Sequence, residues 1–131
     1  MASFILDTHA CVFALVTPEK LGRRARQVMQ RAETGLDEVC IPAAAAAEIQ
    51  LLRELGRTRV GLPEIRAAID DVAGLRFLDL DLAQIDEFAA LVSIRDPFDR
   101  LILGAARATG AKLVTKDRRL SEIGLVEVIW D

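Results

Sequence analysis

The apolar residues of this chain gather in short unbroken runs, and longer stretches with helical spacing separate these runs. Unbroken runs of this length are typical of strands covered on both faces, as in a parallel sheet. The alternation of such strands with helices predicts an α/β sandwich with right-handed crossovers. The predicted strands are residues 4–6, 39–41, 77–80, 112–115 and 126–129.

Helical patterns fill the segments between the predicted strands. The pattern that starts at Pro18 opens with Pro and Glu, which favour a helix start, and two other patterns end just before Gly56 and Gly110. We therefore expect an α/β sandwich around a parallel sheet of the five predicted strands. The length suits one domain, residues 1–131, and a hydrophobic content of 52% can fill its core. The predicted helices are residues 8–16, 18–32, 43–55, 63–73, 82–94 and 97–109.

Four acidic residues that lie far apart in the sequence are expected to meet at one edge of this sheet. Asp7 and Asp117 each follow a predicted strand, and Glu48 lies in a helix that directly follows another. Ligands of open parallel sheets bind beyond the carboxyl ends of the strands, which is the edge that these three residues share. Asp99 opens a helix that leads into a strand, so it joins them only if the preceding helix returns the chain to that edge.

A cluster of carboxylates favours a bound cation. Carboxylates repel one another, and gathering them destabilises the fold unless cations neutralise them. Hard divalent ions such as Mg²⁺ or Mn²⁺ take oxygen ligands and are the usual partners. An acidic pocket that holds such a metal suggests chemistry on phosphate. Thr8 and Thr115 adjoin the acidic positions, and their hydroxyls are candidates to orient a metal-bound water.

Each acidic position also has a structural interpretation that requires no function. Asp7 and Asp96 are good helix N-caps, with Asp99 then falling in the first helical turn. Asp117 suits a turn before two arginines, and Glu48 can rest at the solvated border of an apolar helix stripe. From these residues alone, the functional and structural interpretations both stay open.

The overall charge argues against a nucleic-acid ligand, whereas local clusters of basic residues argue for one. The net charge is −3 and the pI is about 5.2, and nucleic-acid-binding proteins usually carry a basic surface. Basic residues gather at 23–31, 53–59 and 116–119. An acidic pocket rimmed by basic patches would reconcile the average charge with a phosphate substrate. The alternative is that each cluster is a solvated helix face.

Neither the cysteines nor the beginning of the chain indicates secretion or a membrane. Cys11 and Cys40 lie in apolar surroundings without a CxxC pair, which predicts buried free thiols in a reducing compartment. Asp7 interrupts the first apolar stretch, so we expect no signal peptide, and no apolar run approaches the length of a membrane span. The sequence therefore predicts a soluble, cytoplasmic protein that makes no membrane contact.

Four segments, taken in their order along the chain, are similar to a known family. Together they resemble the PIN-domain family, specifically the VapC-like toxins of bacterial toxin–antitoxin pairs, and the likeness covers nearly the whole chain. The segments are FILDTHA at residues 4–10, AEI at 47–49, DPFDRLI at 96–102 and LVTKD at 113–117.

The resemblance implies a compact three-layer α/β/α sandwich with a parallel sheet of about five strands, and a Mg²⁺- or Mn²⁺-dependent endoribonuclease, which hydrolyses RNA phosphodiesters with a metal-activated water. It assigns metal binding and catalysis to Asp7, Glu48, Asp99 and Asp117. It also implies a homodimer that a cognate antitoxin protein holds inactive. The positions expected to support the site are Thr8, Thr115 and Asp96, and the candidate RNA contacts are Arg100, Lys116 and Arg118.

Two other functions are compatible with parts of this pattern. A non-catalytic PIN-like module that binds RNA or a protein would have the same fold, but retention of all four carboxylates argues against it. A phosphoryl-transfer domain of the receiver or haloacid-dehalogenase type also places an Asp after its first strand. The dehalogenase pattern requires a second Asp where this chain has His9, and the only lysine available to a receiver is Lys116, in a different context.

Overall fold

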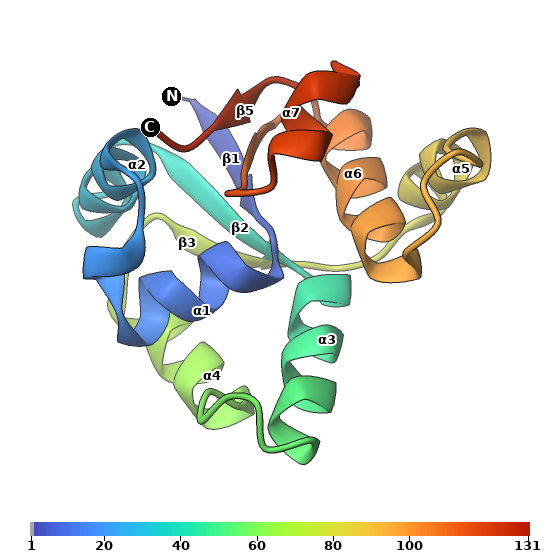
Figure 1. The fold of residues 1–131 in the computed structure, drawn as a ribbon. Helices are drawn as coiled ribbons and strands as arrows, with labels where there is room; N and C mark the ends of the chain where they lie inside the picture. The colour runs from blue at the N-terminus through green and yellow to red at the C-terminus, as the bar shows by residue number, and fades with distance from the viewer. Residues whose placement is uncertain (1) are drawn as a thin grey trace.

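The computed structural model describes residues 2–131 and contains a five-stranded sheet with the strand order β3-β2-β1-β4-β5 (Figure 1). Every pair of neighbouring strands runs parallel, which confirms the predicted sheet. The strands are β1 (Ser3–Leu6), β2 (Glu38–Pro42), β3 (Leu75–Leu78), β4 (Lys112–Val114) and β5 (Val128–Ile129).

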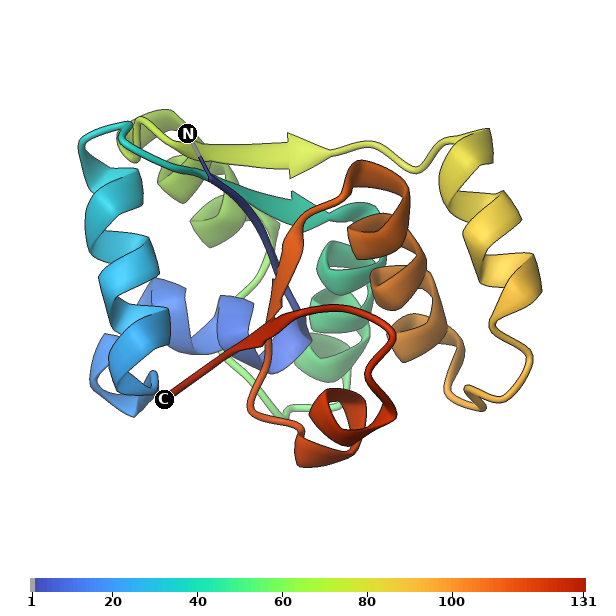
Figure 2. The ribbon, with the colours of Figure 1, turned by 90° about the horizontal axis from the view of Figure 1, so that it is seen from above.

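Helices cover both faces of the sheet and complete the predicted three layers. Helices α1 and α2 lie on one face and α6 lies on the other, with α5 packed against the outer side of α6 (Figure 2). The helices are α1 (Thr8–Val16), α2 (Arg23–Glu33), α3 (Ala43–Glu54), α4 (Leu62–Asp71), α5 (Leu82–Ala90), α6 (Pro97–Thr109) and α7 (Arg118–Ile123), with a 3₁₀ turn η1 at Pro18–Lys20.

The central strand β1 places the first acidic residue at the middle of the carboxyl edge. Ile5 and Leu6 are at most 1% exposed, because β2 and β4 flank the strand and helices cover its two faces. Helix α3 continues from β2 beyond this edge and contacts both α1 and α6 (Figure 1). The carboxyl ends of β1 and β4 and the starts of several helices therefore surround a single region.

The helix predicted over residues 18–32 is wrong in its first part. Residues 18–20 form only η1, and a break at Leu21 and Gly22 precedes α2. Leu21 turns into the core and is 3% exposed. A Cβ on Gly22 would lie 2.3 Å from the carbonyl oxygen of Trp130, so the chain passes too close to the segment after β5 for any larger residue. Tertiary packing thus overrides the helix start that Pro and Glu suggest.

Several further boundaries differ from the sequence prediction, and the helix expected over 63–73 spans Leu62–Asp71. The third strand occupies Leu75–Leu78 rather than 77–80, because Leu75 is buried while Leu80 is exposed. The helix expected to reach residue 94 ends at Ala90, and two tight turns then bury Leu91 and Ile94. The last predicted strand, 126–129, shortens to Val128–Ile129. Helix α7 falls in a segment for which no helix was predicted.

Two expectations about the chain's environment can be compared with the structure. Both cysteines are buried and free, as predicted. Burial raises the pKa of the Cys11 thiol to about 12 and that of Cys40 to about 11. Over residues 2–131, no helix combines the length and the apolar character needed to cross a bilayer.

Candidate active site

A hollow of about 450 Å³ opens at the carboxyl edge, where β1 and β4 end, and we call it the carboxylate pocket. All four predicted acidic residues line it, so the topology gathers side chains from four separate segments. The complete lining is Asp7, Thr8, His9, Phe13, Glu48, Asp96, Asp99, Lys116, Asp117 and Arg119.

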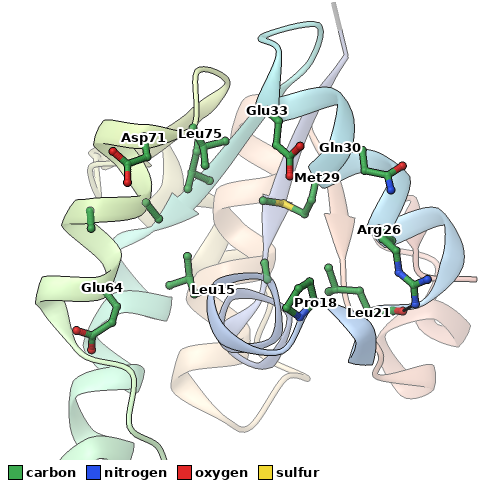
Figure 3. A pocket seen from close by; sticks show the side chains of 14 residues that line it. Leu15, Pro18, Leu21, Arg26, Met29, Gln30, Glu33, Glu64, Asp71 and Leu75 are labelled. Atoms are coloured by element: carbon green, nitrogen blue, oxygen red, sulfur yellow. Dashed lines mark hydrogen bonds between the residues drawn. The ribbon is translucent and has the colours of Figure 1, made fainter.

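Another hollow of about 530 Å³ lies between α1, α2 and α4 (Figure 3). Leu15 and Leu21 contribute to its apolar lining. Its acidic side chains, Glu33, Glu64 and Asp71, stand at separate places around the rim in Figure 3 and do not gather at one point. Although this hollow is the larger one, converging polar groups rather than volume indicate chemistry, and these are found in the carboxylate pocket.

Asp7 joins the strand, the helix and the pocket. Its backbone N–H donates to the carbonyl of Val114 at 3.1 Å, which extends the pairing of β1 with β4. One carboxylate oxygen accepts the N–H of Ala10 at 2.9 Å and caps α1, and the other accepts the hydroxyl of Thr115. Burial is the main influence on this carboxyl group and raises its pKa, despite the two hydrogen bonds that oppose the shift. The capping interpretation is therefore confirmed, and the same residue also faces the pocket.

Glu48 approaches the pocket from the second turn of α3. It is half-buried, and its Oε1 accepts the hydroxyl of Thr8 at 2.5 Å. Thr8 is the first residue of α1 and is 2% exposed, so it fixes one oxygen of this carboxylate from a rigid position. The neighbouring Ile49 is fully buried and sets the direction in which this helix faces the core.

Asp99 reaches the pocket because α5 returns the chain before α6 begins. Helices α5 and α6 pack against each other, and α6 starts at the carboxyl edge. Asp96 caps α6 by accepting the N–H of Asp99 at 2.9 Å, as its sequence position predicts. Burial, and then the charges of Asp96, Glu48, Asp7 and Asp117, raise the pKa of Asp99 to about 6. This carboxyl group is therefore the most strongly affected by its acidic neighbours.

Asp117 was interpreted from the sequence as a turn residue, but in the structure it caps α7. Its Oδ1 accepts the backbone N–H of Arg119 at 2.9 Å, and its Oδ2 accepts the Nη2 of the same residue at 2.9 Å. These contacts with Arg119 hold the pKa of Asp117 below its usual range. The N–H of Asp117 donates to the hydroxyl of Thr115 at 3.0 Å. Thr115 consequently bridges Asp7 and Asp117 at the centre of the edge.

The basic residues divide into those that line the carboxylate pocket and those that do not. Lys116 lines it, as predicted, and so does Arg119, which was not among the candidate RNA contacts. Arg100 instead donates to the carbonyl of Phe88 at 2.8 Å and lies over that ring, so its side chain serves the packing of α6 on α5. Arg118 is exposed and lies outside the lining. Asp117 caps α7 and so turns the second arginine, not the first, toward the pocket.

The donor chemistry of the carboxylate pocket fits a divalent cation. Its acidic side chains offer oxygen ligands, which Mg²⁺ and Mn²⁺ prefer, and burial together with the neighbouring carboxylates raises the pKa of Asp99. In the range 2–131, no three acidic, histidine or cysteine side chains yet converge closely enough to hold an ion. Thr8 holds one oxygen of Glu48, whereas Arg119 contacts both oxygens of Asp117 and so competes with a cation for that carboxylate.

Comparison with known sequences shows similarity to a protein family and to a curated protein. Residues 4–125 match the PIN domain family. The curated protein ribonuclease VapC22 of Mycobacterium tuberculosis is 30% identical over 122 residues, which span 92% of this chain and 91% of that protein.

Comparison with solved structures yields the same fold in several complexes. VapBC2 from Rickettsia felis, bound to a DNA fragment from its promoter, matches with a TM-score of 0.71 and 18% identity over 98% of this chain and 99% of that chain. DNA-bound VapBC from Salmonella typhimurium matches with a TM-score of 0.68 and 19% identity over 98% of each chain. FitAcB from Neisseria gonorrhoeae matches with a TM-score of 0.64 and 18% identity over 96% of each chain. At these identities the likeness establishes a shared fold.

Proposed function

Because this chain belongs to the PIN domain family, we propose that it is a Mg²⁺- or Mn²⁺-dependent endoribonuclease and the toxin of a toxin–antitoxin pair. The observation that carries this proposal is the carboxylate pocket, in which four acidic side chains from distant segments meet at one sheet edge. The ribonuclease name of the relative that is 30% identical supports RNA as the substrate. We take residues 1–131 as one PIN-like domain, which would meet its RNA in the cytoplasm.

We assign the metal ligands to Asp7, Asp99 and Asp117, with Glu48 as a further ligand or as the general base. A divalent ion held by these residues would supply positive charge for the phosphate oxygens and would lower the pKa of an attacking water. Thr8 orients Glu48 so that its carboxylate can take a proton from that water. Thr115 holds Asp7 in one orientation, and Asp96 fixes the start of α6 and hence the position of Asp99.

Two cations on the pocket lining can contact the RNA backbone, and one of them, Arg119, also pairs with Asp117. Lys116 and Arg119 both line the carboxylate pocket, and both side chains are exposed. Contacts of this kind make binding sensitive to salt, because each neutralised phosphate releases counterions. They also explain how a chain of net charge −3 can bind a polyanion: the positive charge is local, and the pocket's own negative charge is balanced by metal.

We propose two protein partners for the same chain. A cognate antitoxin is supported by the structures that share this fold, which are VapBC and toxin–antitoxin complexes. A homodimer is supported by exposed apolar side chains: Leu55, which directly follows α3, is 66% exposed, and Leu82, the first residue of α5, is 75% exposed. Light scattering on the purified chain tests the dimer directly, and a monomer at all concentrations would contradict it.

Cleavage of a structured RNA mixture tests the proposed activity. The antitoxin-free protein should cut RNA with Mg²⁺ or Mn²⁺ and should stop when EDTA is added. Asp99→Asn should abolish cutting while the protein still folds and unfolds in one cooperative thermal transition. Asp86→Asn is the matched control, because Asp86 is exposed on α5 and lies away from the carboxylate pocket.

Two results would reject parts of this assignment. Wild-type cleavage by Asp99→Asn would show that the acidic residue on α6 is not needed for the reaction. Metal binding by a folded wild-type protein that cuts none of the RNAs would instead favour the non-catalytic binding module, which has the same fold and the same carboxylates.

A further inference from the structure

A neighbouring hollow of about 470 Å³, which we call the side hollow, adjoins the carboxylate pocket. Asp96, Asp99 and Arg119 line both hollows and form the wall that they share. The side hollow lies between the segment that joins α5 to α6 and the short helix α7. Its remaining lining consists of Ser93, Ile94, Arg95, Leu120 and Ile123.

The lining of the side hollow differs from that of the carboxylate pocket. Ile94 and Leu120 are 8% and 5% exposed and form an apolar floor that belongs to the core. Ile123, in contrast, is 48% exposed although it stands on the same short helix as Leu120. Ser93 adds a hydroxyl that can donate or accept a hydrogen bond. The hollow thus combines apolar surface with a polar group, as small-molecule and nucleotide sites commonly do.

Three basic side chains are distributed over the two hollows. Lys116 lines only the carboxylate pocket, Arg119 lines both hollows, and Arg95 lines only the side hollow. Arg95 is exposed, and in the described part of the chain no ion pair joins it to a carboxylate. Arg119 pairs with Asp117, whereas Lys116, like Arg95, has no ion pair within residues 2–131. Two such cations, one in each hollow, match the repeated negative charge of a nucleic-acid backbone better than they match a single anion.

We propose that the side hollow receives the nucleotide next to the scissile phosphate and sets the base preference at that position. This inference rests on the proposed function, because it takes RNA as the substrate. Ile123 and the apolar floor contact the face of the base, and Ser93 contacts its edge. Arg95 neutralises the phosphate beyond that nucleotide, while Arg119 stays at the junction of the two hollows. The volume of about 470 Å³ is within the range of sites that hold a ligand of nucleotide size.

Binding can be separated from cleavage with a variant that does not alter the side hollow. Glu48 lines only the carboxylate pocket, so Glu48→Gln protein with Mg²⁺ is suited to titration with a ten-nucleotide single-stranded RNA. The isoleucine δ-methyl NMR signals should report the contact. We expect the signals of Ile123 and Ile94 to shift, and that of Ile85 on α5 to stay in place.

Two pairs of substitutions test the individual contacts. Arg95→Gln should lower the slope of log affinity against log salt by about 1, as loss of one phosphate contact does, whereas Arg66→Gln on α4 should not change it. Ile123→Ala, in otherwise wild-type protein, should change the base found beside the cut in a random RNA pool. Leu36→Ala is its control, because Leu36 is similarly exposed (56%) but lies at the opposite edge of the sheet.

The outcomes distinguish this inference from the proposed function. The inference is supported if RNA shifts the NMR signal of Ile123, if Arg95→Gln changes the salt slope, and if Ile123→Ala changes the base preference. If the wild type cuts RNA while the Ile123 signal and the Arg95→Gln slope match their controls, the side hollow is not a subsite and the nuclease assignment stands. If the wild type neither binds nor cuts any RNA, the proposed function fails and this inference fails with it.

Discussion

Asp37 and Asp99 lie at opposite edges of the same sheet, and their surroundings shift the pKa of the two carboxyl groups in opposite directions. Asp37 precedes β2 at the amino edge, where it accepts the Nε of Arg31 at 2.5 Å and the N–H of Ala2 at 3.0 Å. These contacts, above all the one with Arg31, hold the pKa of Asp37 below its usual range. Burial and carboxylate neighbours raise the pKa of Asp99 to about 6.

The difference between the two edges shows where the fold leaves charge uncompensated. At the amino edge a cation and a backbone N–H satisfy the acid, which is the ordinary arrangement for a buried carboxylate. At the carboxyl edge several acids share one hollow, and the only close ion pair there joins Asp117 to Arg119 in the described residues. Perturbed acids gathered in a hollow are a physical mark of a functional site. The predictions below test this contrast.

The largest expected effect is the loss of cleavage on replacing Glu48 with Gln. As a general base Glu48 should contribute at least about 100-fold to the rate, and the amide cannot accept a proton. Single-turnover cleavage rates with saturating Mn²⁺ give the measurement. Asp37→Asn should keep the wild-type rate, since it lies at the other edge. Equal rates for Glu48→Gln and the wild type would remove Glu48 from the mechanism.

Asp37→Asn should instead lower the thermal stability. The change removes the charge that pairs with Arg31 and weakens the acceptor of the Ala2 N–H, so the unfolding midpoint should fall by several degrees. The effect should fade as the pH drops, because a carboxyl group with a lowered pKa stabilises the fold only while it is ionised. Thermal scans at pH 7 and pH 3 check this, with Asp86→Asn as the control. An unchanged midpoint at pH 7 would show that this pair contributes nothing.

Asp99→Asn should have the reverse effect on stability when no metal is present. A carboxyl group with a raised pKa binds protons more tightly when folded, so its ionised form destabilises the fold above about pH 6. The shift, discounted because the group is partly solvated, corresponds to about 1 kcal/mol. Urea unfolding in EDTA should therefore show the variant to be more stable at pH 7.5, with the difference gone below the ordinary pKa of 3.8. A variant less stable than the wild type at pH 7.5 would contradict this.

The smallest expected effect is a modest gain in metal affinity for Arg119→Gln. Arg119 contacts both oxygens of Asp117, so its removal frees a carboxylate that a cation can use. Isothermal titration with Mn²⁺ should show tighter binding by a few-fold than in the wild type. Arg118→Gln is the matched control, since Arg118 is the neighbouring residue in the sequence but its side chain lies outside the pocket lining. Weaker binding by Arg119→Gln would mean that this arginine supports the metal site.

Much of the fold could be predicted because the residues that start and end its helices act locally. Helices α1 and α6 have the predicted bounds, since Asp7 and Asp96 cap their starts and Gly110, with a φ of 69°, ends the second. The continuous apolar runs identified a parallel sheet, and the strand-end rule brought the acidic residues to one edge. The order of the elements also indicated that Asp99 would reach this edge only if the preceding helix returned the chain to it.

The remaining features depend on contacts that no local pattern encodes. The break before α2 arises because Gly22 meets Trp130, more than a hundred residues away in the sequence. Helix α7 was missed because it has only two turns, although Asp117, Leu120 and Gly124 together form a cap, a buried face and a left-handed end. Because this helix was not predicted, Arg118 and not Arg119 was proposed as an RNA contact. The direction of the helix determines that Arg119 reaches the pocket and Arg118 does not.

The hydrogen bond from Thr115 to Asp7 joins residues 108 positions apart, and this separation has a kinetic consequence. Contacts between such distant parts of a chain form late, because a long loop must close first. At usual rates of synthesis a ribosome needs on the order of ten seconds for a chain of this length. Throughout that time β4 is missing or newly made, so β1 lacks one of its neighbours and the carboxylate pocket is not assembled. The emerging polypeptide should therefore be harmless to nearby RNA until its last third has folded.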